Sequence, residues 1–477
     1  MIDGLKPYPT YKDSGVPWLG EVPGHWEVLP HRALFNEVKD CDHPDEQMLS
    51  VTITRGVIKQ GALLAGSSKK DSSKLDKSAY KLVCPGDITY NKMRAWQGAV
   101  GVSDFRGIVS PAYIVVRLHG EHNPRYFHHI FRTPSFAKEA ERWSYGITSD
   151  MWSLRPEHFK MIYGCLPPLP EQSAIVRFLD QADRRIRRYI HAKQKLIKLL
   201  EEQKEAIIHR AVTRGFDPNV RLKPSGVEWL GDVPEHWEVV RFKRRIGFQE
   251  GPGIMAADFR DEGVPLLRIS CVRWEFASLE GCNFLDPEMV RRRWSHFAVR
   301  AGDYLLSASA STGSVCLATD VVVNAIPYTG ILRLWTMTKE AFMPFVRLYM
   351  GCRPFQQQID AAKSGVGIEH FGPTHLKRMF ITLPPPKEQQ GIVAAVADKI
   401  APFAAAIQRA HREISLLREY RTRLIADVVT GKLDVREAAV RLPDEVDDPE
   451  PLQDTDTLLE GDNDTDEADL DAVRAEA

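Results

Sequence analysis

Hydrophobic residues recur at alternating intervals of three and four in two long stretches of the chain, residues 175–207 and 393–428. This spacing places them on one side of an α-helix and predicts two long helices with a coiled-coil seam. Either stripe alone also fits an ordinary amphipathic core helix. Pro402 is expected to kink or restart the second helix, leaving about 28 continuous residues. The stripe positions are Ile175, Leu179, Ala182, Ile186, Tyr189, Leu196, Leu200 and Ile207, then Val393, Val396, Ile400, Phe403, Ile407, Ala410, Ile414, Leu417, Leu424 and Val428.

Short runs of β-branched and aromatic residues precede each long stretch. Examples are residues 110–118 (SPAYIVVRL) and residues 328–335 (YTGILRLW), with Gly, Pro and Asp in the sequence around them. Such runs predict the strands and turns of a compact mixed domain. Proline clusters at residues 166–170 and 383–386 then mark the helix starts, because proline is tolerated in the first turn of a helix.

Three motifs occur in both halves of the chain in the same order. They are an SGV-x-WLG-x-VP-x-HWEV stretch (14–28 and 225–239), a Gly-Asp pair (86–87 and 302–303) and a Glu-Gln pair (171–172 and 388–389). The repeat predicts a tandem duplication with an α+β fold, in which each mixed α/β domain is followed by a long helix. Packing the two helices antiparallel as a coiled coil is the simplest way to bury both stripes. The Glu-Gln pairs are interpreted as acidic helix caps rather than as partner contacts.

The repeat divides the chain into five segments. We expect compact domains at residues 1–165 and 216–382, helical spacers at residues 166–215 and 383–435, and an acidic tail at residues 436–477. The tail has sixteen Asp and Glu, three Arg and no aromatic residue, so it is predicted to be disordered. We interpret it as a solubilising tail, with competition against nucleic acid as the alternative. The whole chain carries a net charge of −1, so residues 1–435 carry +12 and suit an anionic partner.

Catalytic signatures are missing from the sequence. The seven cysteines are scattered without a C-x-x-C pair, which indicates neither a zinc site nor a disulfide framework. There is no G-x-x-x-x-G-K-[ST] phosphate-binding loop. We therefore expect no catalytic, cofactor-binding or metal-binding residues in this chain. With no apolar run of about 20 residues and no signal-peptide pattern, we also expect a cytoplasmic protein without membrane contact.

A basic protein with two similar domains on a helical rod suits duplex DNA, whose phosphates attract cations. A rod of about 40 Å spans slightly more than one helical turn of DNA, so the two domains could read two separated half-sites. Arg, Asn and Gln pair with base edges in the major groove. Loops that differ between the halves are the candidate readers, although each also fits an ordinary solvated loop. The candidates are Asn91, Lys92, Arg94, Trp96, Gln97, Thr148 and Ser149 in the first half and Arg268, Ser270, Arg273, Ser307, Ser309, Ser311, Thr312 and His370 in the second.

The repeated opening, the YNKMRAWQGAVG loop (90–101) and the LPPLPEQ and LPPPKEQ helix starts together resemble the DNA-specificity subunits of type I restriction-modification systems. The resemblance covers residues 1–435. It implies two target-recognition domains that read an interrupted DNA target, and an antiparallel helical rod whose length sets the gap. It also implies that the chain itself binds no cofactor. Two modification subunits would methylate adenine with S-adenosylmethionine, and restriction subunits would use ATP and magnesium.

Two other functions compete with this interpretation. A coiled-coil adaptor that binds proteins without DNA specificity would also explain the two helical stripes. A self-sufficient methyltransferase or nuclease is disfavoured by the missing cofactor and metal motifs. Within the DNA-reading hypothesis, SASASTG (307–313) replaces the NKMRAWQ loop (91–97) in the second half, so contacts inferred for one half do not transfer to the other.

Overall fold

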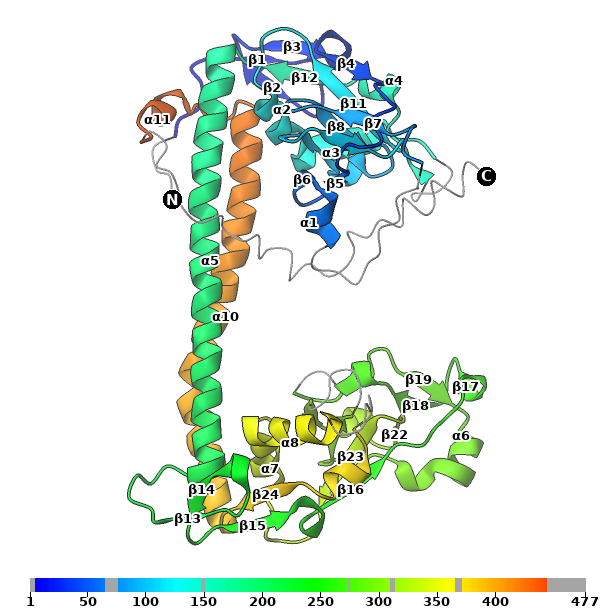
Figure 1. Cartoon of the computed structure of the whole chain (residues 1–477), viewed down its shortest axis with the longest axis vertical. Helices are drawn as coiled ribbons and strands as arrows, with labels where there is room; N and C mark the ends of the chain where they lie inside the picture. The colour runs from blue at the N-terminus through cyan, green and yellow to red at the C-terminus, as the bar shows by residue number, and fades with distance from the viewer. Residues whose placement is uncertain are drawn as a thin grey trace. The chain divides into compact units, whose positions relative to one another are not determined.

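The computed structural model describes residues 5–64, 76–146, 151–272, 275–308, 314–364 and 371–443. The chain divides into two compact units. Unit 1 comprises Met1–Gln194 and His411–Ala477, and unit 2 comprises Lys195–Ala410. Each unit contains a mixed domain and a part of both long helices (Figure 1).

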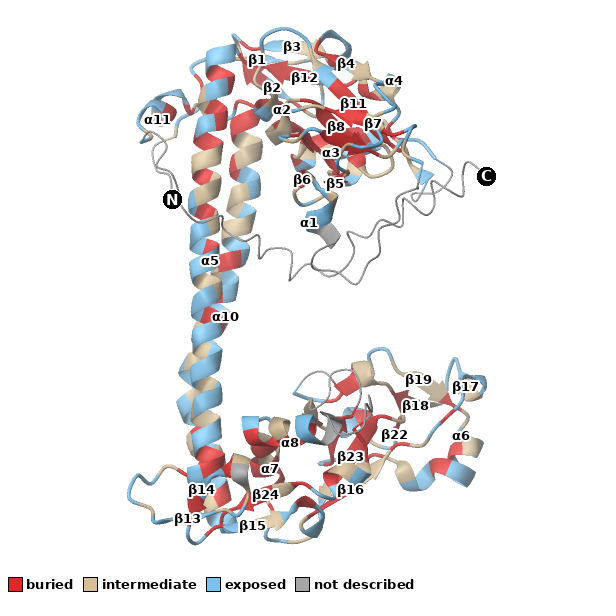
Figure 2. Cartoon of the chain, viewed as in Figure 1, coloured by how far each residue is buried: buried red, intermediate tan, exposed pale blue. Residues whose placement is uncertain are grey.

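Unit 1 is built on a four-stranded antiparallel sheet in the order β4 (Phe35–Val38), β11 (Tyr113–Leu118), β8 (Ile88–Asn91), β9 (Val100–Val102). Every residue of β8 is buried, as expected for a strand covered on both faces (Figure 2). Helices α2 (Pro124–Phe131) and α3 (Pro134–Arg142) each begin with a proline behind a side-chain N-cap. The smaller strand pairs are β1 (Tyr11–Asp13) with β2 (Glu21–Pro23), β3 (Glu27–Pro30) with β12 (Tyr163–Leu166), β5 (Leu49–Thr52) with β6 (Gly56–Lys59), and β7 (Lys81–Val83) with β10 (Gly107–Val109).

Unit 2 repeats this main sheet with the same strand order. The equivalent strands are β16 (Ile246–Glu250), β23 (Ile331–Thr336), β20 (Tyr304–Ser307) and β21 (Val315–Leu317). The pairs β13 (Leu222–Pro224) with β14 (Asp232–Pro234) and β15 (Glu238–Arg241) with β24 (Phe380–Leu383) also have counterparts in unit 1. Unit 2 differs by a second sheet in the order β17 (Phe259–Arg260), β19 (Asn283–Leu285), β18 (Val264–Leu267), β22 (Ile326–Pro327). The predicted duplication of a mixed domain is confirmed.

The Gly-Asp motif forms the same turn in both units. Its two glycines have φ of 91° and 84°, a left-handed conformation that favours glycine. In unit 1 the Asp87 carboxylate accepts two hydrogen bonds from the Arg117 guanidinium, at 2.7 and 2.8 Å. In unit 2 the Asp303 carboxylate lies 3.5 Å from Nε of Arg333. The turn therefore ties the start of β8 to β11 in unit 1 and the start of β20 to β23 in unit 2.

One buried histidine distinguishes the core of unit 1. His31, in the short helix η1 (His31–Ala33), is packed among aromatic rings, with centroid distances of 4.6 Å to Phe159 and 5.1 Å to Phe131. Burial lowers the pKa of His31 from 6.5 to about 3, so the imidazole is neutral near pH 7. In unit 2 the equivalent helix η5 (Phe242–Arg244) has Phe242 at this position. Phenylalanine thus occupies in unit 2 the core position that His31 occupies in unit 1.

We expect His31→Phe to make unit 1 less sensitive to acid. Because the folded-state pKa lies below the unfolded value, the stability associated with His31 is complete above pH 6.5 and is lost as the pH falls toward 3. The loss is about 2 kcal/mol at pH 5. Urea unfolding of both proteins at pH 7.5 and pH 5 measures the difference. An unchanged pH dependence in the variant would show that the pKa of His31 is the same in the folded and unfolded protein.

The long helices are α5 (Leu169–Arg214) and α10 (Pro386–Val429). Both start at the predicted proline clusters. In unit 1, Arg421 of α10 pairs with Asp183 of α5, and Lys193 of α5 lies 2.6 Å from Glu413 of α10. Because one residue number rises as the other falls, the helices are antiparallel. This confirms the predicted fold, in which one long helix packs against the other.

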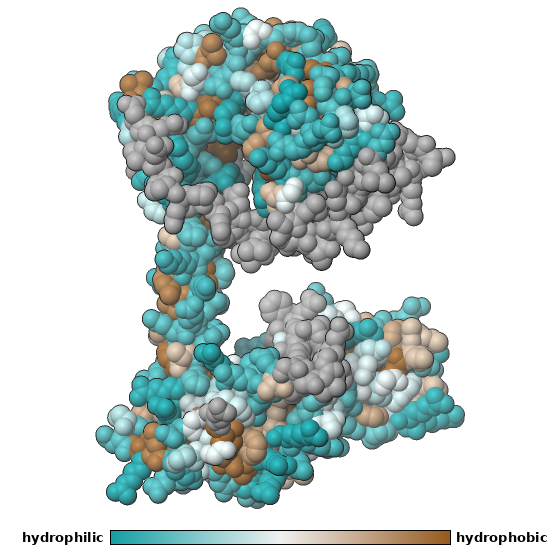
Figure 3. Space-filling view, in the orientation of Figure 1, coloured by the Kyte–Doolittle hydropathy of each residue, from teal (hydrophilic) through white to brown (hydrophobic). Residues whose placement is uncertain are grey.

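The seam of α5 departs from the predicted stripe at two positions. Tyr189 and Leu196 are 50% and 42% exposed, whereas Ile190 and Ile197 are buried. An α-helix has 3.6 residues per turn, so a stripe extrapolated at heptad spacing drifts off the buried side. Leu199 and Leu416 are also exposed. Figure 3 shows hydrophobic residues among polar ones along the visible side of the helices.

The predicted restart at Pro402 is wrong, because α10 continues through this residue, and the predicted kink stays a prediction. Proline removes one backbone hydrogen bond, but its fixed φ is compatible with a helix. Val396 before it and Ile407 after it are both buried, and this packing keeps the segment helical.

α10 is also the one helix among the described residues that could cross a membrane by length and composition alone. Core helices of soluble proteins pass the same test. Ile392 and Val396 of α10 belong to the hydrophobic core of unit 2, together with Trp237 and Phe345. These two apolar residues of α10 thus take part in packing within the protein.

The acidic tail begins later than predicted. Residues Arg436–Val440 form α11, and Val435 and Ala439 are buried in the core of unit 1. Apolar residues four positions apart lie on one side of a helix, which is why this segment packs despite the charged sequence that follows. Residues 444–477 lie outside the described residues.

Candidate nucleic-acid interface

The loop from β8 to β9, called the 91–100 loop, has a defined structure. It contains the short helix η2 (Ala95–Gln97), which ends at Gly98 with φ of 95°. Asn91 is buried, and its Oδ1 accepts a hydrogen bond from Met93 N at 2.9 Å. Trp96 Nε1 donates to Met93 O at 2.9 Å. Asn91 therefore stabilises the loop from the buried side, and its side-chain amide is not exposed at the surface.

The outer side of the 91–100 loop carries polar and aromatic groups. Gln97 is exposed, while Lys92, Arg94 and Trp96 are half-buried. The Trp96 ring meets Trp152 edge to face, with centroids 5.6 Å apart. Such a platform combines a guanidinium, an amide and an ammonium group with an aromatic support. These are the groups that bind base edges and phosphates in DNA.

Unit 2 places its described candidates differently. Ser307 ends β20, the equivalent of β8, and is fully buried like Asn91. Arg268 is half-buried, with its guanidinium 4.2 Å from the ring centroid of Tyr328 and 5.6 Å from that of Phe259. Ser270 is half-buried two residues later. Arg268 and Ser270 are neighbours in the sequence, and the described residues of unit 2 show no second platform like that of unit 1.

Seven predicted site residues lie outside the described residues. They are Thr148, Ser149, Arg273, Ser309, Ser311, Thr312 and His370. Their roles stay predictions.

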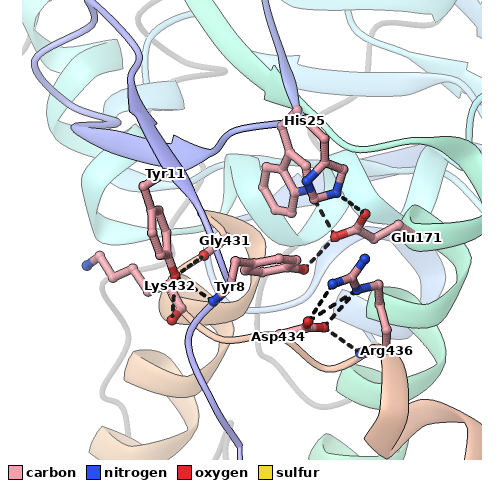
Figure 4. Close-up of polar contacts among 9 residues, drawn as sticks. Tyr8, Tyr11, His25, Glu171, Gly431, Lys432, Asp434 and Arg436 are labelled. Atoms are coloured by element: carbon pink, nitrogen blue, oxygen red, sulfur yellow. Dashed lines mark hydrogen bonds and ion pairs between the residues drawn. The ribbon is translucent and has the colours of Figure 1, made fainter.

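The Glu-Gln pairs join each long helix to its mixed domain. Glu171 is buried, and its carboxylate accepts hydrogen bonds from Tyr8 Oη at 2.5 Å and Trp26 Nε1 at 2.9 Å (Figure 4). The same carboxylate lies 2.8 Å from Nε2 of His25. Burial, and then the hydrogen bond to Glu171, raise the pKa of Tyr8, so its hydroxyl remains a donor. We call this arrangement the helix-start clamp.

Unit 2 contains the same clamp with fewer donors. Glu388 lies 2.8 Å from Nε2 of His236 and accepts a hydrogen bond from Trp237 Nε1 at 3.0 Å. Its side chain is 35% exposed, compared with 5% for Glu171. In both units, the His-Trp dipeptide of the repeated opening therefore binds the glutamate at the start of the long helix.

The glutamines of the pairs hold the next helix of each domain. Oε1 of Gln172 accepts a hydrogen bond from Asn123 N at 2.9 Å, and Oε1 of Gln389 accepts one from Phe342 N at 2.8 Å. Asn123 and Phe342 are the N-cap residues of α2 and α7 (Met343–Met350). Both glutamines also donate to a backbone carbonyl five residues earlier. The prediction treated these residues only as helix caps. They also connect the long helix to the mixed domain and so position one on the other.

Residues that sequence reasoning missed complete unit 1. Tyr11 Oη donates to Gly431 O at 3.1 Å (Figure 4). Lys6 forms an isolated β-bridge with Asp434. Arg436 pairs with Asp434 at 2.6 Å. The signal that could have revealed this closure is the VTRGF stretch (212–216) at the end of α5, which VTGKL (429–433) matches at the end of α10.

The described cysteines are free thiols, and no group of three or more His, Cys, Asp or Glu in the described part of the chain could hold a metal. Burial raises the pKa of Cys165 to about 11 and the pKa values of Cys316 and Cys352 to about 12. These thiols are protonated near neutral pH, and they behave as small hydrophobic side chains.

The amino-acid sequence is similar to those of known proteins. No protein-family model matches the chain. It is 23% identical over 275 residues to the type I restriction enzyme MjaVIII specificity subunit of Methanocaldococcus jannaschii, a match that covers 57% of this chain and 62% of the relative. It is 22% identical over 444 residues to the specificity subunit assigned to type I restriction enzyme MjaX of the same organism, covering 88% of this chain and 96% of the relative. The resemblance to type I restriction specificity subunits is confirmed.

A solved structure supports the same fold. A chain from a study of complex assembly and conformational transition of a type I restriction-modification system superposes with a TM-score of 0.63. The two chains are 16% identical, and the match covers 86% of this chain and 99% of the other. The likeness therefore concerns the architecture of tandem domains and long helices.

Proposed function

We propose that this chain is the DNA-reading specificity subunit of a type I restriction-modification complex. The observation that carries the proposal is the internal repeat. Both units build the same main sheet, Gly-Asp turn and helix-start clamp, but the residues that follow the equivalent strands β8 and β20 differ in sequence. A constant frame with different loops suits two readers of different half-sites. The curated relatives, which are specificity subunits, support this function.

The proposed DNA contacts are the polar and aromatic groups of the loops that differ between units. Asn91 and Ser307 are buried, so they would position their loops from below. The remaining candidates are Lys92, Arg94, Trp96, Gln97, Thr148 and Ser149 in the first domain and Arg268, Ser270, Arg273, Ser309, Ser311, Thr312 and His370 in the second. The surplus of positive charge over residues 1–435 would favour phosphate contacts around these loops.

The partners follow from the same proposal. Two modification subunits that use S-adenosylmethionine and restriction subunits that use ATP and magnesium would supply the chemistry, and the chain itself would bind no cofactor. The recognition domains would span residues 1–165 and 216–382, with residues 166–215 and 383–435 as spacers. Such a complex would act in the cytoplasm. The exposed apolar side chains of Tyr189, Leu196 and Leu199 on α5 offer contact area for a protein partner.

Replacing Arg94 and Gln97 by Ala should impair recognition of one half-site and spare the other. Each lost base contact is expected to lower discrimination by about tenfold, because a bidentate pair contributes roughly 1–3 kcal/mol. Methylation mapping of the complex, with and without the substitutions, measures the tolerated bases at each position. The control is Arg268→Ala in unit 2, which should change the other half-site.

Equal loss at both half-sites would contradict a reading role for the 91–100 loop. A continuous motif, or none, for the wild-type complex would contradict the proposed function itself. Salt titration separates this function from the coiled-coil adaptor. DNA binding through six or more phosphates should weaken about 10³-fold or more between 50 and 200 mM salt, whereas an apolar protein contact would not.

A further inference from the structure

Arg132 joins two turns of unit 1. It follows α2 directly as the C-cap residue of that helix. Its guanidinium donates to backbone carbonyls in the 91–100 loop and in the turn between β5 and β6, called the 52–56 turn. The acceptors are Thr52 O at 3.5 Å, Ile53 O at 2.7 Å, Thr54 O at 2.6 Å, Gly98 O at 3.4 Å and Val100 O at 3.0 Å.

Two glycines allow the turns to approach closely. A Cβ on Gly101 would lie 3.1 Å from Cα of Gly56 and 3.3 Å from Nδ1 of His128, and Gly56 has a φ of 73°. His128 is neutral, because burial holds its pKa well below the usual value. Its Nδ1 accepts a hydrogen bond from Val102 N at 3.3 Å. The 52–56 turn and the 91–100 loop are therefore joined by close backbone contact as well as by Arg132.

The hydrogen bonds from Arg132 to the two turns are called the clasp. Unit 2 shares the frame, but its described residues show no clasp. Asn123 and Phe342 start α2 and α7 with the same backbone hydrogen bond to a clamp glutamine. The residue after α7 is Gly351, which has no side chain to make a clasp. The clasp thus belongs to the part of unit 1 that differs between the two copies. Under the proposed function, that part carries the sequence preference of each domain.

We propose that the 52–56 turn is a second DNA-contacting element of unit 1, and that Arg132 is the positioning residue that sets it beside the 91–100 loop. This inference rests on the proposed function. Thr54 is exposed and Arg55 is half-exposed, so the turn presents a hydroxyl and a guanidinium. Both groups bind base edges or phosphates of duplex DNA. The ligand of the joined surface is one half-site of the target.

The test uses the full chain in complex with its modification subunits. Arg132→Lys keeps the charge but has one nitrogen in place of two, so it cannot keep all the hydrogen bonds to the 52–56 turn and the 91–100 loop. Gly101→Ala pushes the 52–56 turn away by a different route. Both variants should lower the preference for the correct base in the first half-site by about tenfold. Thr54→Ala and Arg55→Ala should affect positions in the same half-site. Methylation rates on duplexes with single-base changes in each half-site provide the measurement.

Arg117→Lys serves as the matched control, because it weakens the Gly-Asp frame without touching either turn. It should lower the melting temperature and leave the base preferences of both half-sites unchanged. The inference is overturned if Arg132→Lys and Gly101→Ala lower only the melting temperature, as the control does. It is also overturned if Thr54→Ala and Arg55→Ala both leave the first half-site unchanged. Failure of the proposed function would be visible separately, as a wild-type complex without an interrupted motif.

Discussion

Removing one heptad from each long helix is expected to shorten the gap between the half-sites by about three base pairs. Seven residues span about 10.5 Å of helix, and DNA rises about 3.4 Å per base pair. The proposed deletions are residues 198–204 of α5 and residues 401–407 of α10. They face each other if the antiparallel register of Lys193 with Glu413 continues along the helices. Seven residues are close to two turns, so the buried sides of both helices stay aligned.

Methylation at the original target should fall by about 10³-fold or more, because a complex that cannot engage both half-sites has only non-specific affinity left. Genome-wide methylation mapping would identify the new gap. A heptad inserted at the same places should lengthen the gap by the same amount. In the control variant, the polar residues of the same two heptads are replaced, while the apolar positions and the helix length stay the same. This variant should leave the gap unchanged. An unchanged gap after the deletion would show that the helices do not set the spacing.

Glu171→Gln is expected to destabilise unit 1 by about 3 kcal/mol, because buried donors lose a charged acceptor. Trp26 is fully buried and Tyr8 is 3% exposed, so water cannot replace the carboxylate. The equivalent change Glu388→Gln should cost only about 1 kcal/mol, since the side chain of Glu388 is 35% exposed and can be solvated. Hydrogen exchange of backbone amides, assigned to each unit, measures the two losses.

Tyr8→Phe is the control for the clamp. It removes one donor and leaves the carboxylate bonded to the indole of Trp26, so its effect should be smaller than that of Glu171→Gln. The protection factors of unit 2 should not change in either unit 1 variant. Equal destabilisation by Glu171→Gln and Glu388→Gln would contradict the explanation based on burial.

The architecture could be predicted because its determinants are local. Apolar spacing along the stretches 175–207 and 393–428 predicts helices, and α5 and α10 contain them. The repeated motifs predict two similar mixed domains, and the sheets β4-β11-β8-β9 and β16-β23-β20-β21 have the same order. Helical periodicity and a duplicated pattern both depend on neighbours along the chain, which a sequence displays directly.

The candidate site was predicted only in outline. The residue types of the 91–100 loop indicate a candidate site, but only the structure shows that Asn91 is buried and Gln97 is exposed. Arg132 was not identified, because its carbonyl partners lie up to 80 residues away and carbonyls leave no mark in a sequence. The helix restart expected at Pro402 and the burial expected at Tyr189 are wrong for a related reason, since packing against a second helix decides which positions are buried.

By itself, the sequence determined the duplication, the two long helices and their starting points, because these follow from periodicity and from residues that limit the backbone. Tertiary structure alone decided what the repeated motifs do. The HWE stretch and the Glu-Gln pair are 145 residues apart at Trp26 and Glu171, and only folding shows them as one hydrogen-bonded clamp. The proposed reading surface depends on tertiary structure in the same way, because its two turns are joined through Arg132. Contacts between distant residues depend on how burial and polar satisfaction are balanced throughout a unit, and no local pattern records that balance.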